Sequence, residues 1–162
     1  MSTPAQALLR PLVEADAARC GAIVAVTPLW QRYGLGAEQA AARLRAGAAA
    51  GDLLLVVEEA GQVEGFAWVA PRGAFSRWGY LRLIAVSPER RGRRYGEQLL
   101  DAVEARARES TTECYLLVSD FNVEAQRFYR RQGYEEVGRI PDMVLPGVAE
   151  LIYRKRLGAP PA

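Results

Sequence analysis

Residues 83–100 read LIAVSPERRGRRYGEQLL and carry the strongest structural signal in the chain. An apolar run ends at Val86, a Ser-Pro turn follows, and an arginine-rich loop with two glycines leads into the next segment. In that segment Tyr95, Leu99 and Val103 recur at i, i+4 and i+8, which is typical of the buried face of a helix. The stretch therefore predicts a buried strand, a glycine-containing loop and a helix.

The start of this helix is suited to an anion. The N–H groups of a first helical turn lack intrahelical acceptors, and the helix dipole makes this end positive. Four guanidinium groups able to bind phosphate in a bidentate manner precede the helix: Arg90, Arg91, Arg93 and Arg94. Neither G-x-x-x-x-G-K-[ST] nor G-x-G-x-x-G is present in this loop. Taken alone, the loop is also compatible with a solvated basic turn before a surface helix.

A second motif lies in residues 116–138, LLVSDFNVEAQRFYRRQGYEEVG. Asn122 or Asp120 is placed to cap a helix, and Gly133 is placed to end it in a left-handed conformation. Three residues share one face of this helix: Ala125, Phe128 and Tyr129. Alone, the Phe-Tyr pair is typical of core aromatics, but here it follows the arginine-glycine helix start.

The two motifs together resemble the GNAT superfamily of N-acetyltransferases, whose members transfer an acetyl group from acetyl-CoA to an amine. The family's acetyl-CoA motif, [QR]-x-x-G-x-[GA] between a strand and a helix, is met at Arg91 and Gly96. It departs at Arg94, where the family usually has glycine; we expect this residue to be helical and free of strain. The downstream family pattern N-x-x-A-x-x-F-Y-x-x-x-G-[FY] is met at Asn122, Ala125, Phe128, Tyr129, Gly133 and Tyr134.

Periodicity and turn signals predict one α/β (α+β) domain over residues 1–162, with its motif core at about 80–135. Strands are expected at 7–13, 52–60, 62–70, 79–87, 113–119, 134–141 and 149–156. Helices are expected at 14–26, 37–49, 94–109 and 123–132, with a loop or broken helix at 27–36 and a turn at 71–78. The resemblance implies a mixed, mostly antiparallel sheet of about seven strands, splayed between strands 4 and 5 and flanked by about four helices.

The resemblance also implies where acetyl-CoA binds. Main-chain groups expected to meet the acetyl carbonyl and the pantetheine amides belong to Ile84, Ala85 and Val86. Backbone N–H groups expected to hold the pyrophosphate belong to Arg91, Gly92, Arg93, Arg94, Tyr95 and Gly96. Tyr129 is expected to protonate the departing thiolate, because a phenol with a pKa near 10 retains its proton at neutral pH. Asn122 is expected to contact the cofactor arm, or to serve only as a helix cap.

The sequence defines the general base and the acceptor site less closely than it defines the acetyl-CoA site. The carboxylates considered as base are Glu58, Glu59, Glu64 and Asp120, with a surface or capping role and a water chain as alternatives. By resemblance, residues 27–36 and 140–148 wall the acceptor site. The aromatic residues able to line it are Trp30, Tyr33, Phe75 and Tyr80, and these are equally compatible with a core role.

Composition narrows the function classes. The chain has 21 basic residues, of which Lys155 alone is lysine, against 19 acidic residues, and it has no histidine. Histidine-activated nucleophiles and imidazole metal sites are therefore excluded. Cys20 and Cys114 cannot form a four-ligand zinc centre, so we expect two core thiols in a reducing compartment and no metal.

The net charge of +2 argues against a nucleic-acid partner bound through Arg90–Arg94 and Arg127–Arg131. No apolar run approaches the length of a membrane span, and the first residues do not resemble a signal peptide, so we expect a cytoplasmic protein. The partners expected are acetyl-CoA and an amine acceptor, and the apolar last strands are compatible with a homodimer. The alternative function is a catalytically silent acyl-CoA sensor.

Overall fold

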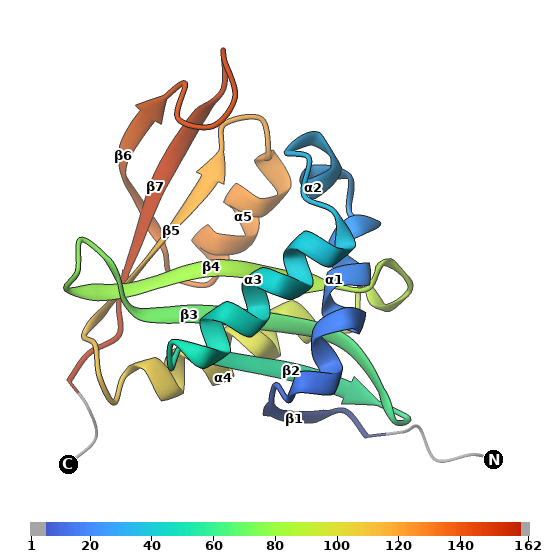
Figure 1. The fold of residues 1–162 in the computed structure, drawn as a ribbon. Coiled ribbons are helices and arrows are strands. Elements are labelled where there is room, and N and C mark those ends of the chain that lie inside the picture. Colours follow the sequence, from blue (N-terminus) through green and yellow to red (C-terminus); the bar gives the residue numbers. More distant parts are fainter. Residues whose placement is uncertain (1–5, 160–162) are drawn as a thin grey trace.

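The computed structural model describes residues 6–159, which form a seven-stranded sheet with helices on both faces (Figure 1). The strands are β1 (Leu8–Pro11), β2 (Leu53–Glu59), β3 (Gln62–Ala74), β4 (Trp78–Val86), β5 (Glu113–Ser119), β6 (Glu135–Pro141) and β7 (Ala149–Arg156). The helices are α1 (Ala17–Ala25), α2 (Pro28–Arg32), α3 (Ala37–Ala49), α4 (Tyr95–Ala107) and α5 (Val123–Arg131). Short 3-10 turns occur at η1 (Glu14–Asp16) and η2 (Pro88–Arg90).

The strand order is β1-β2-β3-β4-β5-β7-β6, and every neighbouring pair is antiparallel except β4 and β5. These two central strands are parallel and pair only at Gly79–Cys114 and Tyr80–Tyr115. Beyond these pairs they diverge, so that β5–β7 rise away from β1–β4 in Figure 1. The predicted mixed sheet and its splay between strands 4 and 5 are confirmed.

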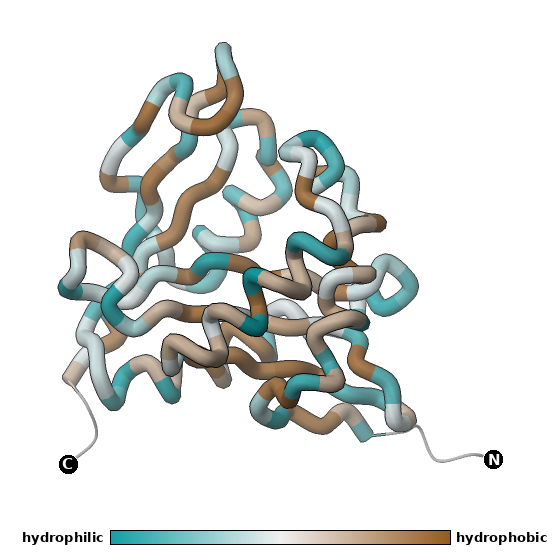
Figure 2. The backbone as a smooth tube through the Cα atoms, viewed as in Figure 1, coloured by the Kyte–Doolittle hydropathy of each residue, from teal (hydrophilic) through white to brown (hydrophobic). Residues whose placement is uncertain are grey.

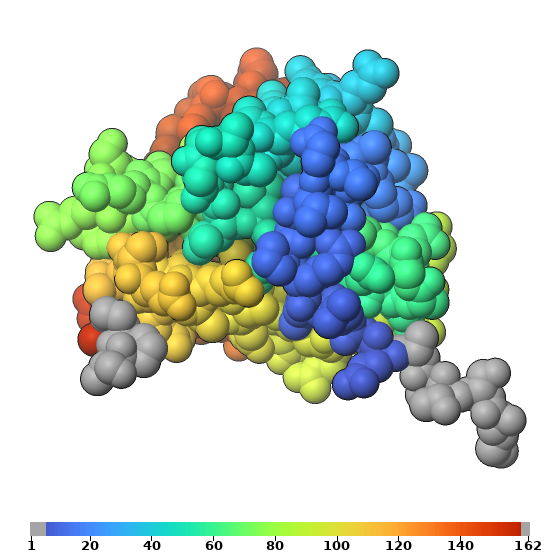
Figure 3. All heavy atoms as spheres, turned by 60° about the horizontal axis from the view of Figure 1, so that its bottom comes forward, coloured from blue at the N-terminus to red at the C-terminus, as the bar shows by residue number. Residues whose placement is uncertain are grey.

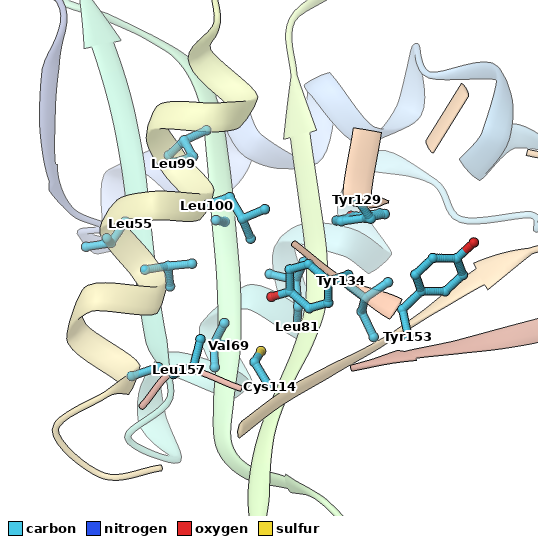
Figure 4. Close-up of a cluster of buried hydrophobic side chains, with 14 of the residues drawn as sticks. Leu55, Val69, Leu81, Leu99, Leu100, Cys114, Tyr129, Tyr134, Tyr153 and Leu157 are labelled. Atoms are coloured by element: carbon cyan, nitrogen blue, oxygen red, sulfur yellow. The ribbon is translucent and has the colours of Figure 1, made fainter. Parts of the chain in front are cut away.

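Two hydrophobic cores lie on the two faces of the sheet. Helix α4 covers one face, where Leu99 and Leu100 pack against strands β2 to β4 (Figure 4). Helices α1 and α3 cover the other face, where Phe66 and Trp68 of β3 are buried; Figure 3 shows these two helices side by side. Residues 63–70 of β3 are all buried because alternate side chains enter opposite cores. Apolar residues follow β2 and β3 in Figure 2.

Two predicted segments differ from the structure. The expected turn at 71–78 is shorter, because β3 continues to Ala74 and the chain reverses through Phe75 and Ser76, both left-handed at φ 54° and 56°. A bulge between Ala70 and Ala74 leaves Pro71 outside the regular pairing, where its missing N–H is tolerated. The expected loop or broken helix at 27–36 contains a fifth helix, α2, with Pro28 in its first turn.

Both cysteines are fully buried free thiols, as predicted for core residues. Among residues 6–159, no group of three or more acidic or cysteine side chains is arranged to hold a metal ion. None of the helices in this described part combines the length and the hydropathy that crossing a bilayer requires.

Candidate active site

The divergence of β4 and β5 opens a cleft of about 1560 Å³ in the middle of the sheet. Its walls come from both faces of the sheet: the start of α4 and helix α5 on one side, and helices α2 and α3 with the loop between them on the other. Most of the strand residues that line it are Tyr80–Val86 of β4 and Leu116–Ser119 of β5, and Trp68 of β3 and Glu150 of β7 line it as well. Strand edges without a pairing partner therefore face a space large enough for an extended ligand.

A bulge in β4 shapes this edge. Pairing with β3 jumps from Val69–Leu81 to Trp68–Leu83, which leaves Arg82 as an extra residue on β4. Such a bulge bends a strand and re-aims its side chains. As a result Leu81 belongs to the α4-side core and Leu83 to the α1/α3-side core. The expected cofactor residues 84–86 follow the bulge, and all three line the cleft.

The loop before α4 supplies hydrogen-bond donors. Within residues 6–159, no acceptor is found for five backbone N–H groups, those of Gly92, Arg94, Tyr95, Gly96 and Glu97. All five residues line the cleft. Unpaired N–H groups at the positive end of a 13-residue helix form an anion site.

The expectation that Arg94 is helical is wrong. Its φ is 62° and its ψ 21°, so it has the left-handed conformation that glycine adopts most readily. It immediately precedes α4. An L-residue with a side chain bears about 1 kcal/mol of strain in this conformation. Gly92, at φ 82°, is left-handed as well, so two turns of this kind lead into the helix.

Three of the four loop arginines form ion pairs with carboxylates. Arg90 Nε lies 3.1 Å from Glu59 and from Glu64, and Arg93 Nη1 lies 2.6 Å from Glu59. Arg94 forms a bidentate pair with Glu97 at 2.8 and 2.7 Å.

Among the described residues, Arg91 alone of the four has no acidic partner within 4.0 Å. Arg93 is also the one expected cofactor residue that does not line the cleft. Arg90 and Arg93 thus anchor the loop to β2 and β3, and the backbone supplies most of the donors.

Tyr129 of α5 lines the cleft, as does Asn122 at the start of the same helix. It is 8% exposed, and burial raises the pKa of its hydroxyl, which keeps the phenol neutral. In the described part of the chain no hydrogen-bond partner is found for this hydroxyl. Its ring packs edge-on against Phe128 and Tyr134 at centroid distances of 5.2 and 5.7 Å. Tyr129 therefore presents a neutral hydroxyl whose proton is not used within the described residues.

Asn122 is the cap of α5, because its Oδ1 accepts from Ala125 N at 3.1 Å. The capping role predicted from sequence is confirmed. Since Asn122 also lines the cleft, its side-chain amide donors remain available there.

The far end of the cleft is aromatic. Trp30, Tyr33 and Tyr80 all line it, with Phe121 stacked on Tyr33 at 6.5 Å. Phe75 does not, because it lies 71% exposed on the β3–β4 turn. That turn protrudes at one end of the molecule in Figure 3.

Of the two expected walls, residues 27–36 contribute most of their side chains, whereas residues 140–148 contribute Val144.

None of the four expected base candidates lines the cleft. Glu58 pairs with Arg10, and Asp120 accepts from Ala149 N at 3.1 Å. As described above, Glu59 and Glu64 anchor the arginine loop. Sequence reasoning missed Glu150, which is 5% exposed and lines the cleft from β7. The available signal was one acid inside the apolar run VAELIY.

Residues 50–136, more than half of the chain, match the family model described as the acetyltransferase (GNAT) domain. The chain belongs to the GNAT acetyltransferase family. It is therefore an acetyltransferase by family, and its splayed sheet is the GNAT fold. None of the curated protein sequences compared with it gives a significant match.

Solved structures of GNAT proteins have the same fold over nearly the whole chain. A GNAT-family protein from Desulfovibrio desulfuricans has a TM-score of 0.78 at 24% identity, covering 94% of this chain and 100% of its own. The ribosomal-protein-alanine N-acetyltransferase of Brucella melitensis has a TM-score of 0.76 at 26% identity, covering 92% and 99%. A Salmonella typhimurium protein solved with its cofactor acetyl-CoA has a TM-score of 0.76 at 21% identity, covering 96% and 98%.

Proposed function

We propose that this GNAT protein transfers the acetyl group of acetyl-CoA to a primary amine of a small molecule or peptide. The amine attacks directly in a ternary complex, and residues 1–162 act as a single acetyltransferase domain. The observation that carries the proposal is the cleft, which is lined from both faces of the sheet. Two substrates entering from opposite faces can meet where β4 and β5 diverge.

The residues present fit acetyl-CoA. The five unpaired N–H groups that begin at Gly92 suit a pyrophosphate, and Arg91 adds one guanidinium. The open edge of β4 at residues 84–86 suits the amides of the pantetheine arm, in the manner of an added strand. The Salmonella relative holds acetyl-CoA in the same fold, which supports this choice of ligand.

Tyr129 is the proposed general acid. Its hydroxyl donates a proton to the thiolate as the carbon–sulfur bond breaks, and burial keeps the phenol protonated until then. Main-chain donors of the β4 edge orient the acetyl carbonyl and stabilise the negative charge that develops on its oxygen. Acetyl-CoA supplies the activated acetyl group.

Two measurements test the proposal. Acetyl-CoA at 100-fold over its Kd should stabilise the fold by about 2.7 kcal/mol in a thermal-shift titration. With an amine panel, release of free CoA thiol should then report turnover. Tyr129→Phe should lower kcat by about 10²- to 10⁴-fold, with little change in KM for acetyl-CoA.

Tyr115→Phe is the matched control, because Tyr115 lies on β5 outside the cleft and donates to Glu113. It should retain wild-type kcat. Binding of acetyl-CoA without thiol release from any amine would contradict the enzyme and favour the acyl-CoA sensor. Unchanged turnover in Tyr129→Phe would remove that residue from the mechanism.

A further inference from the structure

Glu150 lies at the aromatic end of the cleft and is held by two hydroxyl groups. Tyr33 donates to Oε1 at 2.5 Å, and Ser119 Oγ lies 3.3 Å from Oε1 and 3.4 Å from Oε2. Tyr33 and Ser119 also lie within hydrogen-bond distance of each other, so when Tyr33 donates to Glu150 the single Ser119 proton goes either to Tyr33 or to Glu150. The carboxylate is thereby fixed in orientation, while Oε2 is left with one long contact.

Glu150 differs from the other buried carboxylates in its charge balance. Asp16 pairs with Arg10, Glu59 and Glu64 pair with loop arginines, and Glu104 pairs with Lys155. For Glu150, no arginine or lysine nitrogen of residues 6–159 lies within the 4.0 Å of an ion pair. Burying a carboxylate without a counter-ion costs free energy of folding. The chain has 21 basic residues that could have supplied one. Because no basic side chain among these residues balances the charge of Glu150, we infer that a cationic ligand does so.

The groups around this carboxylate suit an organic cation. Tyr33, Trp30 and Phe121 form a run of aromatic rings with centroid distances of 6.3 and 6.5 Å. Aromatic faces attract ammonium groups and cover the apolar carbons beside them. From β4, Tyr80 and Arg82 face the same end of the cleft, and Arg32 follows from α2 with its guanidinium over Phe121.

The neighbouring strands place Ser119 and Ile140 opposite Glu150, and neither of these residues titrates. The titratable and charged groups of the surrounding elements are Tyr33 and Arg32 from the α2 region and Tyr80 and Arg82 from β4. Two further carboxylates are close: Asp52, which lines the cleft 3.9 Å from Arg82, and Asp120, which accepts from Ala149 N and pairs with Arg139. Burial raises the pKa of both tyrosines, and Glu150 raises it further, so these phenols stay neutral. Asp52 and Asp120 each pair with an arginine, so among these groups Glu150 is the carboxylate without an ion-pair partner and the available acceptor for a proton from the ligand.

We propose that Glu150 binds the acceptor as an alkyl ammonium ion and takes its proton, so that the acceptor class is the strongly basic, aliphatic primary amine. This inference rests on the proposed acetyl transfer and assigns its missing base. Tyr33 and Ser119 are positioning residues, because their contacts fix the orientation of the carboxylate and leave Oε2 with fewer partners than Oε1.

The proton and electron balance is complete. One N–H proton passes to Glu150, and the freed nitrogen lone pair forms the bond to the acetyl carbonyl carbon. The carbon–sulfur bond then breaks, and its electron pair leaves on sulfur, which takes the Tyr129 proton. The nitrogen loses its second proton, which restores Tyr129, and Glu150 returns the first to solvent. The products are an amide, the CoA thiol and one proton.

The test compares Glu150→Gln with two classes of amine. At pH 7 only about 0.1% of an alkyl amine with a pKa near 10 is neutral, whereas an α-amine with a pKa near 7.8 is about 14% neutral. We expect kcat/KM for the alkyl amine to fall at least about 100-fold at pH 7, and for an α-amine such as that of glycinamide less than about 10-fold. The alkyl-amine loss should shrink about tenfold per pH unit between pH 7 and 9, as the free amine forms without a base.

Glu136→Gln is the control, because Glu136 lies exposed on the adjacent strand β6 outside the cleft, and it should behave as wild type. Acetyl-CoA should stabilise Glu150→Gln as much as it stabilises wild type, which separates this inference from the cofactor site. A loss equal for both amines and independent of pH would overturn the base assignment, as would unchanged activity. If the wild type binds acetyl-CoA but acetylates no amine, the proposed function itself fails.

Discussion

The only lysine of the chain is predicted to be a core residue whose loss destabilises the fold. Lys155 Nζ donates to Glu104 Oε2 at 2.7 Å, and Tyr134 donates to Oε1 of the same carboxylate at 2.8 Å. The Glu104 side chain is 4% exposed and that of Lys155 is 23% exposed. The cluster joins α4 to β7 and to Tyr134, which directly precedes β6 and is labelled in Figure 4. Lys155→Met therefore leaves a buried carboxylate with one hydroxyl partner.

The magnitude follows from the burial of the pair. Removing one partner of a fully buried ion pair costs about 3–5 kcal/mol. Because the lysine end is partly exposed, water compensates in part, and we expect about 2–3 kcal/mol, the range of a charge-assisted hydrogen bond. For a domain of this size, that free energy of unfolding corresponds to a Tm lower by about 4–12 °C.

Equilibrium unfolding in urea measures the effect, with Glu104→Gln and the double variant completing a cycle. In the double variant a neutral glutamine accepts from Tyr134 and a methionine packs beside it, so neither charge is orphaned. The loss of unfolding free energy in the double variant should therefore be smaller than the sum of the two single losses by about 1–2 kcal/mol. Additive effects, or a Lys155→Met cost below about 0.5 kcal/mol, would refute the reasoning.

Two further predictions concern the cysteines and the arginine loop. Cys20 and Cys114 should react with a thiol reagent at pH 8 only as the protein unfolds, because burial raises their pKa to about 12 and about 11 and the thiolate is the reactive form. Rapid labelling in native buffer would contradict this. Arg94→Gly should be more stable than Arg94→Ala by about 1 kcal/mol in urea unfolding, since φ is 62°. Arg93 serves as the control: Arg93→Ala should be at least as stable as Arg93→Gly. If the alanine variant were the more stable one at position 94 as well, Arg94 would be unstrained.

Much of the fold follows from local signals. Helix α3 at 37–49 and strand β5 at 113–119 have the bounds expected from alanine content and from the apolar run. The β3–β4 turn was placed wrongly, since Pro71 and Gly73 are typical of a turn, whereas a bulge absorbs them into the strand. Helix α2 is too short for its period to be seen in sequence. Local preference fails where tertiary packing decides.

The candidate site divides in the same way. The α5 cap and the face that carries Tyr129 follow from one helix and were predictable. The role of the loop arginines was not, because their partners Glu59 and Glu64 lie on strands about 30 residues earlier. Glu150 could not be predicted as a site residue for the same reason, because Tyr33, its main hydrogen-bond donor, is 117 positions away in the sequence. Residues that function through distant partners leave no local pattern.

The position of the cleft follows from the connection between β4 and β5. Parallel neighbours require a crossover, and α4 provides it, so α4 must begin near the carboxyl end of β4. The strands pair only at their first residues, so they are furthest apart at that same end. One local unit thus brings together unpaired helix N–H groups and an unpaired strand edge, which is the usual place for a ligand in such sheets. The opposite end of the cleft, by contrast, is assembled from α2 and β7, which lie far apart in the sequence, and the proton acceptor proposed there is the buried carboxylate of Glu150.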